Sequence, residues 1–142
     1  MMWRIVGRVL VLRETREAPT DAEWEAFLAA LKGYRKQVDE LRLVIVTDGG
    51  GPNSTQRLGL KDALAGGKTF RSAVISDSIK IRFMASALML IVRNHASFTS
   101  KEVERAYDHL SLTPEERRTV DETLSELERE LGQSSAPRPD SN

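Results

Sequence analysis

The stretch LRLVIVTDGGGPNSTQRLG, residues 41–59, joins a short apolar run to a glycine-rich loop and the start of a helix. Nearly every side chain in residues 41–46 is apolar, a pattern typical of a parallel-sheet strand that is covered on both faces. Asn53 or Ser54 can cap the helix that follows. Since ligands of parallel α/β sheets bind at the carboxyl ends of strands, a functional site is expected at this loop.

The rest of the chain alternates strands and helices in the same way. Gly7 and Arg8 interrupt the first apolar run, which predicts one long strand or two short ones. The expected strands are residues 3–13, 41–48, 70–76 and 95–98, and the expected helices are 21–34, 54–64, 78–93, 99–110 and 114–131. We therefore predict an α/β domain over residues 1–111 with about four mainly parallel strands, an additional C-terminal helix within 112–131, and a disordered tail, 132–142.

The segment 78–93 predicts a helix with a narrow polar stripe that includes Arg82 and Ser86. Most of its circumference is therefore expected to be covered by other parts of the protein. Core packing is the favoured interpretation, although a wall containing Met84 and Met89 would also suit an adaptable apolar pocket.

The last predicted helix carries a regular apolar stripe. Val120, Leu124, Leu127 and Leu131 recur at spacings of four, three and four residues. Two heptads make a weak coiled coil, so we expect this helix to dock on the domain rather than to form a free zipper. A dimer contact through the same helix stays open.

The composition limits the classes of function. Lysine plus arginine number 21 and aspartate plus glutamate number 21, so no positive surplus points to nucleic acid. The absence of cysteine excludes disulfides, thiolate catalysis and cysteine-ligated metals. Neither a signal peptide nor a membrane-length apolar run is recognisable, so we expect a cytoplasmic protein without membrane contact and without a cofactor.

The three consecutive glycines Gly49, Gly50 and Gly51 let the loop approach a phosphate or another backbone closely. A nucleotide-binding P-loop needs a lysine and a hydroxyl directly after its last glycine, and Lys61 comes too late for that spacing. Asp48 ends the strand, but no acidic pair at the end of the first strand accompanies it. Hydrogen bonding to loop amides is therefore the favoured role for this carboxylate.

Ser54 and Thr55 place two hydroxyls at the amino end of a helix, where free amides and the helix dipole would stabilise a phosphate. On the residues alone, simple capping is the favoured interpretation. His95 and His109 have no serine or carboxylate placed by sequence to form a triad, so both are expected to be structural. We predict no catalytic residue and no metal site.

The order of elements over residues 1–111 resembles that of the STAS domains, which include bacterial anti-sigma-factor antagonists. LVIVTDGGGPNSTQRLG is similar to the family's apolar strand, loop and hydroxyl-bearing helix start, where a typical sequence reads D-S-S-G-L-G. FRSAVIS, the helix after it and the F-x-S of SFTS resemble the family's later elements. The resemblance implies that a partner kinase phosphorylates the hydroxyl and switches partner binding off. It points to Ser54 if the helix starts are aligned, and to Thr55 if the Leu-Gly pair is aligned.

We therefore expect a non-enzymatic regulatory module that binds a protein partner, a kinase or a regulator. The predicted contact is the loop, with Asp48, residues 49–51 and Asn53, together with the helix after it. Two alternatives stay open. The apolar helix 78–93 could line a pocket for a small molecule or lipid. Less favoured is a phosphate-handling enzyme that uses the loop with Ser54 and Lys61.

Overall fold

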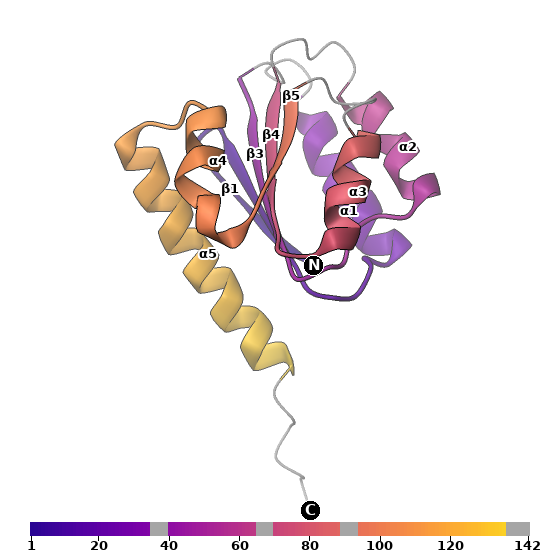
Figure 1. Ribbon diagram of the computed structural model, residues 1–142. Coiled ribbons are helices and arrows are strands. Elements are labelled where there is room, and N and C mark those ends of the chain that lie inside the picture. The colour runs from indigo at the N-terminus through magenta and orange to yellow at the C-terminus, as the bar shows by residue number, and fades with distance from the viewer. Residues whose placement is uncertain (35–39, 65–69, 89–93, 136–142) are drawn as a thin grey trace, which may run out of the picture.

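The computed structural model describes residues 1–34, 40–64, 70–88 and 94–135, and five strands in these ranges form one sheet in the order β1-β2-β3-β4-β5 (Figure 1). The strands are β1 (Met2–Val6), β2 (Val9–Glu14), β3 (Arg42–Thr47), β4 (Arg71–Ile75) and β5 (Asn94–Phe98). β1 runs antiparallel to β2, and every other neighbouring pair is parallel. The predicted α/β class with a mainly parallel sheet is confirmed.

Helices cover both faces of the sheet (Figure 1). α1 (Asp21–Gly33), α2 (Ser54–Ala63) and α3 (Ile79–Leu88) lie on one face, and the short 3-10 turn η2 (Ser100–Glu102), α4 (Val103–His109) and α5 (Pro114–Ser135) lie towards the other. Each of α1, α2 and α3 leads to the next parallel strand in the same direction, so right-handed crossovers put all three on one face. Within the described ranges, no helix has the length and apolarity needed to cross a bilayer.

The alternation of side chains along the strands builds two cores. Leu10 and Leu12 of β2 point towards α1 and α2, whereas Val9 and Val11 point towards α4 and α5. The helices contribute Trp24, Phe27, Leu31 and Leu60 to the first core, and Ala106, Tyr107, Val120 and Leu127 to the second. Because β2 is buried on both faces, nearly all of its side chains are apolar.

The sheet has five strands where about four were predicted, because the first apolar run of the sequence forms both β1 and β2. This run forms two short strands joined by a two-residue turn, with Val6 paired to Val9. Gly7 has a φ of +60°, a left-handed conformation that favours glycine. The prediction of two short strands, rather than one long strand, is therefore confirmed for this run.

The predicted helix starts are capping boxes. The pairs are Thr20 with Glu23 at α1, Asn53 with Gln56 at α2, Thr99 with Glu102 at η2, and Thr113 with Glu116 at α5. At α2 the cap is Asn53 and not Ser54, because Asn53 Oδ1 accepts a hydrogen bond from Gln56 N at 2.8 Å. Ser54 and Thr55 are thus the first two residues of the helix itself. Residues 65–69, which follow the predicted end of this helix, lie outside the described residues.

α5 docks on the sheet as predicted. Val120 and Leu127 are fully buried in the core beside β1 and β2. The Tyr107 hydroxyl of α4 donates to Asp121 Oδ1 of α5 at 2.6 Å, which joins the two helices of this face. The C-terminal helix is therefore part of the domain's packing.

The end of α5 differs from the prediction. The helix ends at Ser135 rather than at Leu131. Gly132 costs only about 1 kcal/mol relative to alanine inside a helix, which does not by itself stop the hydrogen-bond ladder. The remainder of the predicted tail, residues 136–142, lies outside the described residues.

The prediction that most of the helix 78–93 is covered is wrong for its described part. The buried side chains of α3 are Ile81, Ala85 and Leu88. Ile79 is 70% exposed and Phe83 is 76% exposed. α3 packs beside the edge strand β5, and no described helix follows it on this face. Met89 lies outside the described residues.

Glu116 joins the hairpin turn to the start of α5. Its carboxylate accepts hydrogen bonds from Arg8 Nε and Nη2 at 2.8 and 2.9 Å and from Thr113 N at 2.9 Å. The bond from Arg8 is the main reason why the pKa of Glu116 falls to about 2. We expect Glu116→Ala to lower the free energy of unfolding by about 1–2 kcal/mol at neutral pH, because a cap and a bidentate ion pair are lost together.

The contribution of Glu116 depends on pH in a defined direction. Its pKa is lower in the folded chain than in the unfolded chain, so the stabilisation is complete above about pH 5 and is lost as the pH falls towards 2. Urea unfolding of the wild type and Glu116→Ala should therefore converge in acid. Glu115→Ala, which changes an exposed neighbour, is the control, and an equal loss in both variants would contradict the assignment.

Candidate functional site

The glycine-rich loop between β3 and α2 is held by hydrogen bonds within the protein. Gly50 N donates to Thr15 O at 2.8 Å. The Thr47 hydroxyl donates to Gly50 O at 2.6 Å and accepts from Gly49 N at 3.1 Å. The amide of Gly50 therefore ties the loop to the segment that follows β2, and the amide of Gly49 closes the loop on Thr47.

Close packing explains two of the three glycines. A Cβ atom on Gly50 would lie 2.1 Å from Glu17 O, and one on Gly51 would lie 2.9 Å from Met84 Sδ. Both residues are buried. Gly49 instead has a φ of +135°, which other residues rarely adopt. The loop is thus a tightly packed cover over the interior.

Asp48 lies apart from the loop amides. Its carboxylate accepts hydrogen bonds from Arg13 Nη2 at 3.0 and 3.2 Å, and the side chain is about half exposed. The interpretation that Asp48 binds loop amides is wrong, because its side chain points to the face of the sheet that carries Arg13. Thr47, the preceding residue, points to the opposite face and makes those bonds instead.

The predicted phospho-acceptors lie on the surface. Asn53, Ser54 and Thr55 are all exposed at the start of α2. Leu58, one turn further along, is also exposed, at 68%. Lys61 lies in the last turn of α2, about 10 Å along the helix from Ser54, so the structure does not bring it to the loop.

Strand pairing gives His95 a partner that the sequence did not indicate. β4 and β5 place Ser72 opposite His95, and Ser72 Oγ lies 2.6 Å from His95 Nδ1. Both residues are buried, and desolvation lowers the pKa of His95 to about 4. His109 Nε2 lies 2.9 Å from Asn94 O, within hydrogen-bond distance of a β5 carbonyl. Both histidines therefore have contacts that fit the predicted structural roles.

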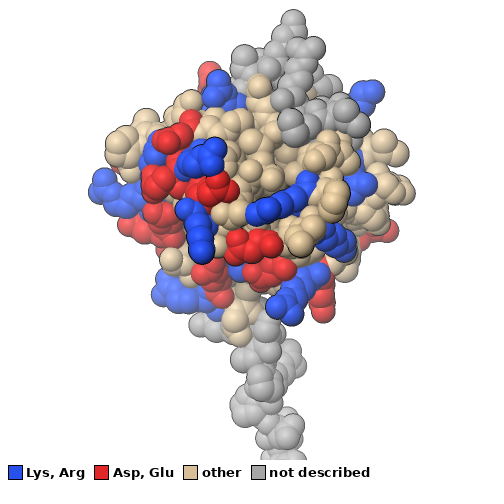
Figure 2. Space-filling model, in the orientation of Figure 1, with Lys and Arg blue, Asp and Glu red and all other residues tan. Residues whose placement is uncertain are grey.

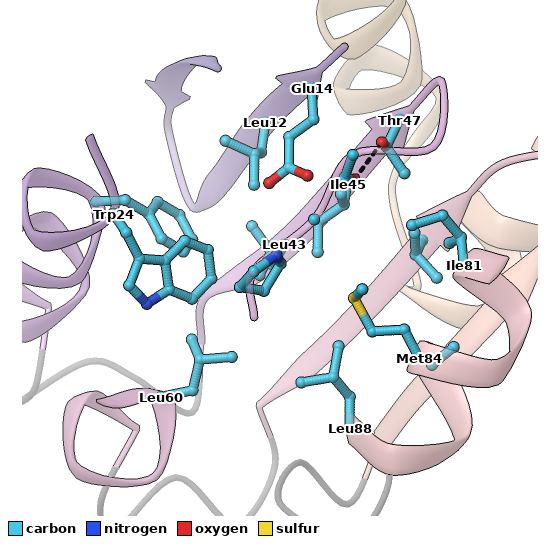
Figure 3. Close-up of a pocket in the computed structure, with 16 residues that line it drawn as sticks. Leu12, Glu14, Trp24, Leu43, Ile45, Thr47, Leu60, Ile81, Met84 and Leu88 are labelled. Carbon is cyan, nitrogen blue, oxygen red and sulfur yellow. Dashed lines mark hydrogen bonds between the residues drawn. The ribbon is translucent and has the colours of Figure 1, made fainter. Parts of the chain in front are cut away.

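A cavity of about 50 Å³ lies between the sheet and the three helices α1, α2 and α3. Its walls are almost entirely hydrocarbon, with Gly50 and Gly51 among the residues that line it. Figure 3 shows Glu14 and Thr47 at one end, and Leu60 with Leu88 towards the other. The predicted apolar helix lines the cavity through Ile81, Met84, Ala85 and Leu88. The glycine-rich loop and the apolar helix, considered separately in the sequence, thus meet at one cavity.

Glu14 was not among the residues that the sequence singled out. It is the last residue of β2 and is only 2% exposed. Side chains two residues apart on a strand lie on the same face of the sheet, so Glu14 points the same way as Leu10 and Leu12. This is the face that carries the cavity (Figure 3). An acidic residue at an inward position of an apolar strand was the signal that could have identified it.

No residue in the described ranges donates a hydrogen bond to the Glu14 carboxylate. Desolvation raises the pKa of Glu14 to about 7, against a smaller opposing effect from the α-amino group of Met1 and a further increase from Glu23. Near neutral pH this carboxyl is therefore present in both protonation states.

A polar groove of about 660 Å³ lies at the carboxyl edge of the sheet. Four of the charged groups that line it have partners, since Arg13 contacts both Asp48 and Glu128, and Asp77 accepts hydrogen bonds from Ser100 N and Oγ at 2.9 and 2.7 Å. Within the described part of the chain, no cluster of three or more acidic, histidine or cysteine residues could hold a metal ion.

A scan against models of known protein families found no match, and no curated protein is significantly similar to the chain. The resemblance to STAS domains therefore stays a prediction that rests on the residues and on the order of elements.

Proposed function

We propose that the chain is a non-enzymatic, STAS-like regulatory module that binds a protein partner through the start of α2 and the neighbouring outer face of α3. Phosphorylation of Ser54 or Thr55 is the proposed switch. The observation that carries this proposal is the exposure of three large apolar side chains, Leu58 on α2 and Ile79 and Phe83 on α3. The hydroxyls of Ser54 and Thr55, at the start of α2, are exposed as well.

The hydroxyls and one of the apolar side chains share a face of α2. Ser54 precedes Leu58 by four residues and Thr55 precedes it by three, spacings that bring side chains together on a helix. A phosphate on either hydroxyl would place negative charge within one turn of Leu58. Such a charge disrupts an apolar interface because it must be desolvated when the partner docks.

α3 extends the proposed surface. Ile79 and Phe83 are four residues apart and therefore lie on one side of the helix. The exposed residues Lys80 and Arg82 flank them. α2 and α3 both begin where a parallel strand ends, so their first turns lie at the same edge of the sheet. The surface suits a partner that presents apolar and acidic side chains.

The distribution of charge agrees with this choice of face. Figure 2 shows mixed acidic and basic side chains over the side that carries α4 and α5, and a larger uncharged area with scattered basic side chains over α2 and α3. An exposed apolar area rimmed by polar groups is typical of a protein-binding surface.

We expect Phe83→Ser to weaken partner binding by about tenfold or more, because an exposed aromatic side chain at the centre of an interface is a frequent hot spot. Ser54→Asp and Thr55→Asp should weaken it too, with the larger effect at the true acceptor. The partner is first identified by affinity capture and mass spectrometry from the native cell, and binding of the purified pair is then measured by calorimetry.

Arg118→Ser is the matched control, because it removes a large exposed side chain from α5 on the other face. It should bind like the wild type, and all variants should unfold within about 0.5 kcal/mol of it. Unchanged binding by Phe83→Ser and both aspartate variants would remove the proposed surface and its switch.

A further inference from the structure

The cavity under the glycine-rich loop has one polar end and one apolar end. Glu14 and Thr47 lie at the first, and Leu60 and Leu88 lie at the second (Figure 3). A cavity of 150 Å³ admits benzene, so about 50 Å³ admits two or three heavy atoms. The space therefore suits a very small amphiphilic molecule.

Among the polar side chains that line the cavity, Glu14 is the one that has no hydrogen-bond partner in the described residues. Trp24 Nε1 donates to Gln56 O at 2.7 Å, and the Thr47 hydroxyl donates to Gly50 O at 2.6 Å. A buried water needs two to four polar partners, and a single carboxylate in a hydrocarbon wall is a poor site for one. A ligand that combines an apolar part with a strong donor fits better.

Burial of a carboxyl that accepts no hydrogen bond from the described residues lowers stability, and an apolar side chain of the same volume would pack here without that loss. The position is 2% exposed and lies at the end of a strand whose other inward side chains are leucines. A polar group that the fold does not need, aimed into a cavity, is a candidate for ligand binding.

We propose that this cavity binds a small primary ammonium ion, with the ammonium group against the Glu14 carboxylate and the alkyl part towards Leu60 and Leu88. A cation is favoured over a neutral donor because an ion pair compensates the desolvated carboxylate more fully than a hydroxyl does. An anion is excluded by repulsion from the same carboxylate. This site is independent of the outer surface of α2 and α3 proposed to bind a protein.

The test uses ethylamine, with ethanol and acetate as probes of the same size and different charge. Titration of the ¹⁵N-labelled protein, followed by NMR, should show saturable shifts of the Thr47, Gly50 and Gly51 amides with ethylamine. Affinity should be about tenfold higher near pH 8 than near pH 6, since Glu14 must ionise to form the pair. Ethanol should bind more weakly without this pH dependence, and acetate should not bind.

Two variants separate charge from shape. Glu14→Gln keeps the volume of the side chain and should abolish the preference for ethylamine over ethanol. Ala85→Val adds methyl groups to the wall of the cavity and should exclude both probes while leaving Glu14 in place. Equal binding of ethylamine and ethanol to the wild type, unchanged ethylamine binding by Glu14→Gln, or shifts confined to residues away from the cavity would overturn the proposal.

Discussion

Replacing Gly50 by alanine is expected to lower the free energy of unfolding by about 3 kcal/mol. A Cβ atom at this position would lie 2.1 Å from Glu17 O and 2.6 Å from Thr15 O. Both are backbone atoms, so the clash cannot be relieved by rotating a side chain. The loop must move away, and the hydrogen bond from Gly50 N to Thr15 O at 2.8 Å is then lost.

Urea unfolding followed by the fluorescence of Trp3 and the buried Trp24 measures this loss, which corresponds to a fall in Tm of roughly 10 °C. Gly132→Ala is the control, because nothing lies within 4 Å of a Cβ there and the position is exposed within α5. It should stabilise the protein by about 0.5–1 kcal/mol. Equal effects of the two substitutions would show that the loop moves freely, and its role as a packed cover would be wrong.

The local features of the fold were predictable because their causes are local. Thr20 and Thr113 begin helices through bonds to residues three positions away, and such spacings can be read from the sequence. The run from residue 41 to 46 is apolar because its strand is covered on both faces. The α/β class followed from these short-range patterns.

The contents of the candidate site were not predictable in the same way, because they depend on contacts between distant segments. Ser72 meets His95 through the register of β4 and β5. The clash that Gly50 avoids is with Glu17, which precedes it by more than thirty residues. The glycines of the loop suggested freedom to bind a phosphate, whereas their structural role is close packing against another backbone.

The exposure of α3 was missed for a related reason. The composition of the helix indicates what its side chains are, but only the position of α3 beside the edge strand shows that its outer face has no described cover. Ile79 and Phe83 therefore looked like core residues in the sequence. Their exposure in the folded chain is what supports a binding surface.

One loop connects the two proposed sites. Gly50 and Gly51 face inward and line the cavity, whereas Asn53, Ser54 and Thr55 face solvent a few residues later. The inner part is fixed by backbone contacts and the outer part begins a capped helix. The hydroxyls are thus presented on a rigid support, as a surface that binds a specific partner requires.

Glu14→Gln is expected to stabilise the protein by about 3 kcal/mol above pH 7 and to have almost no effect below pH 4. The pKa of Glu14 rises from an ordinary value of 4.5 to about 7 in the folded chain, mainly because the carboxyl is desolvated. Below pH 4 both the folded and the unfolded chain are protonated at this position, so burial carries no charge. Between pH 4.5 and 7 only the unfolded chain ionises, and stability falls as the pH rises.

Urea unfolding of the wild type and Glu14→Gln from pH 4 to 8 measures the divergence of the two curves. Glu17→Gln, an exposed glutamate in the segment that follows, is the control and should track the wild type within about 0.5 kcal/mol. Parallel curves for the wild type and Glu14→Gln would mean that the carboxylate is hydrated or paired, and the ammonium site would lose its basis. A divergence that grows with pH would instead show that the fold is more stable without this charge, which leaves ligand binding as the reason for its position.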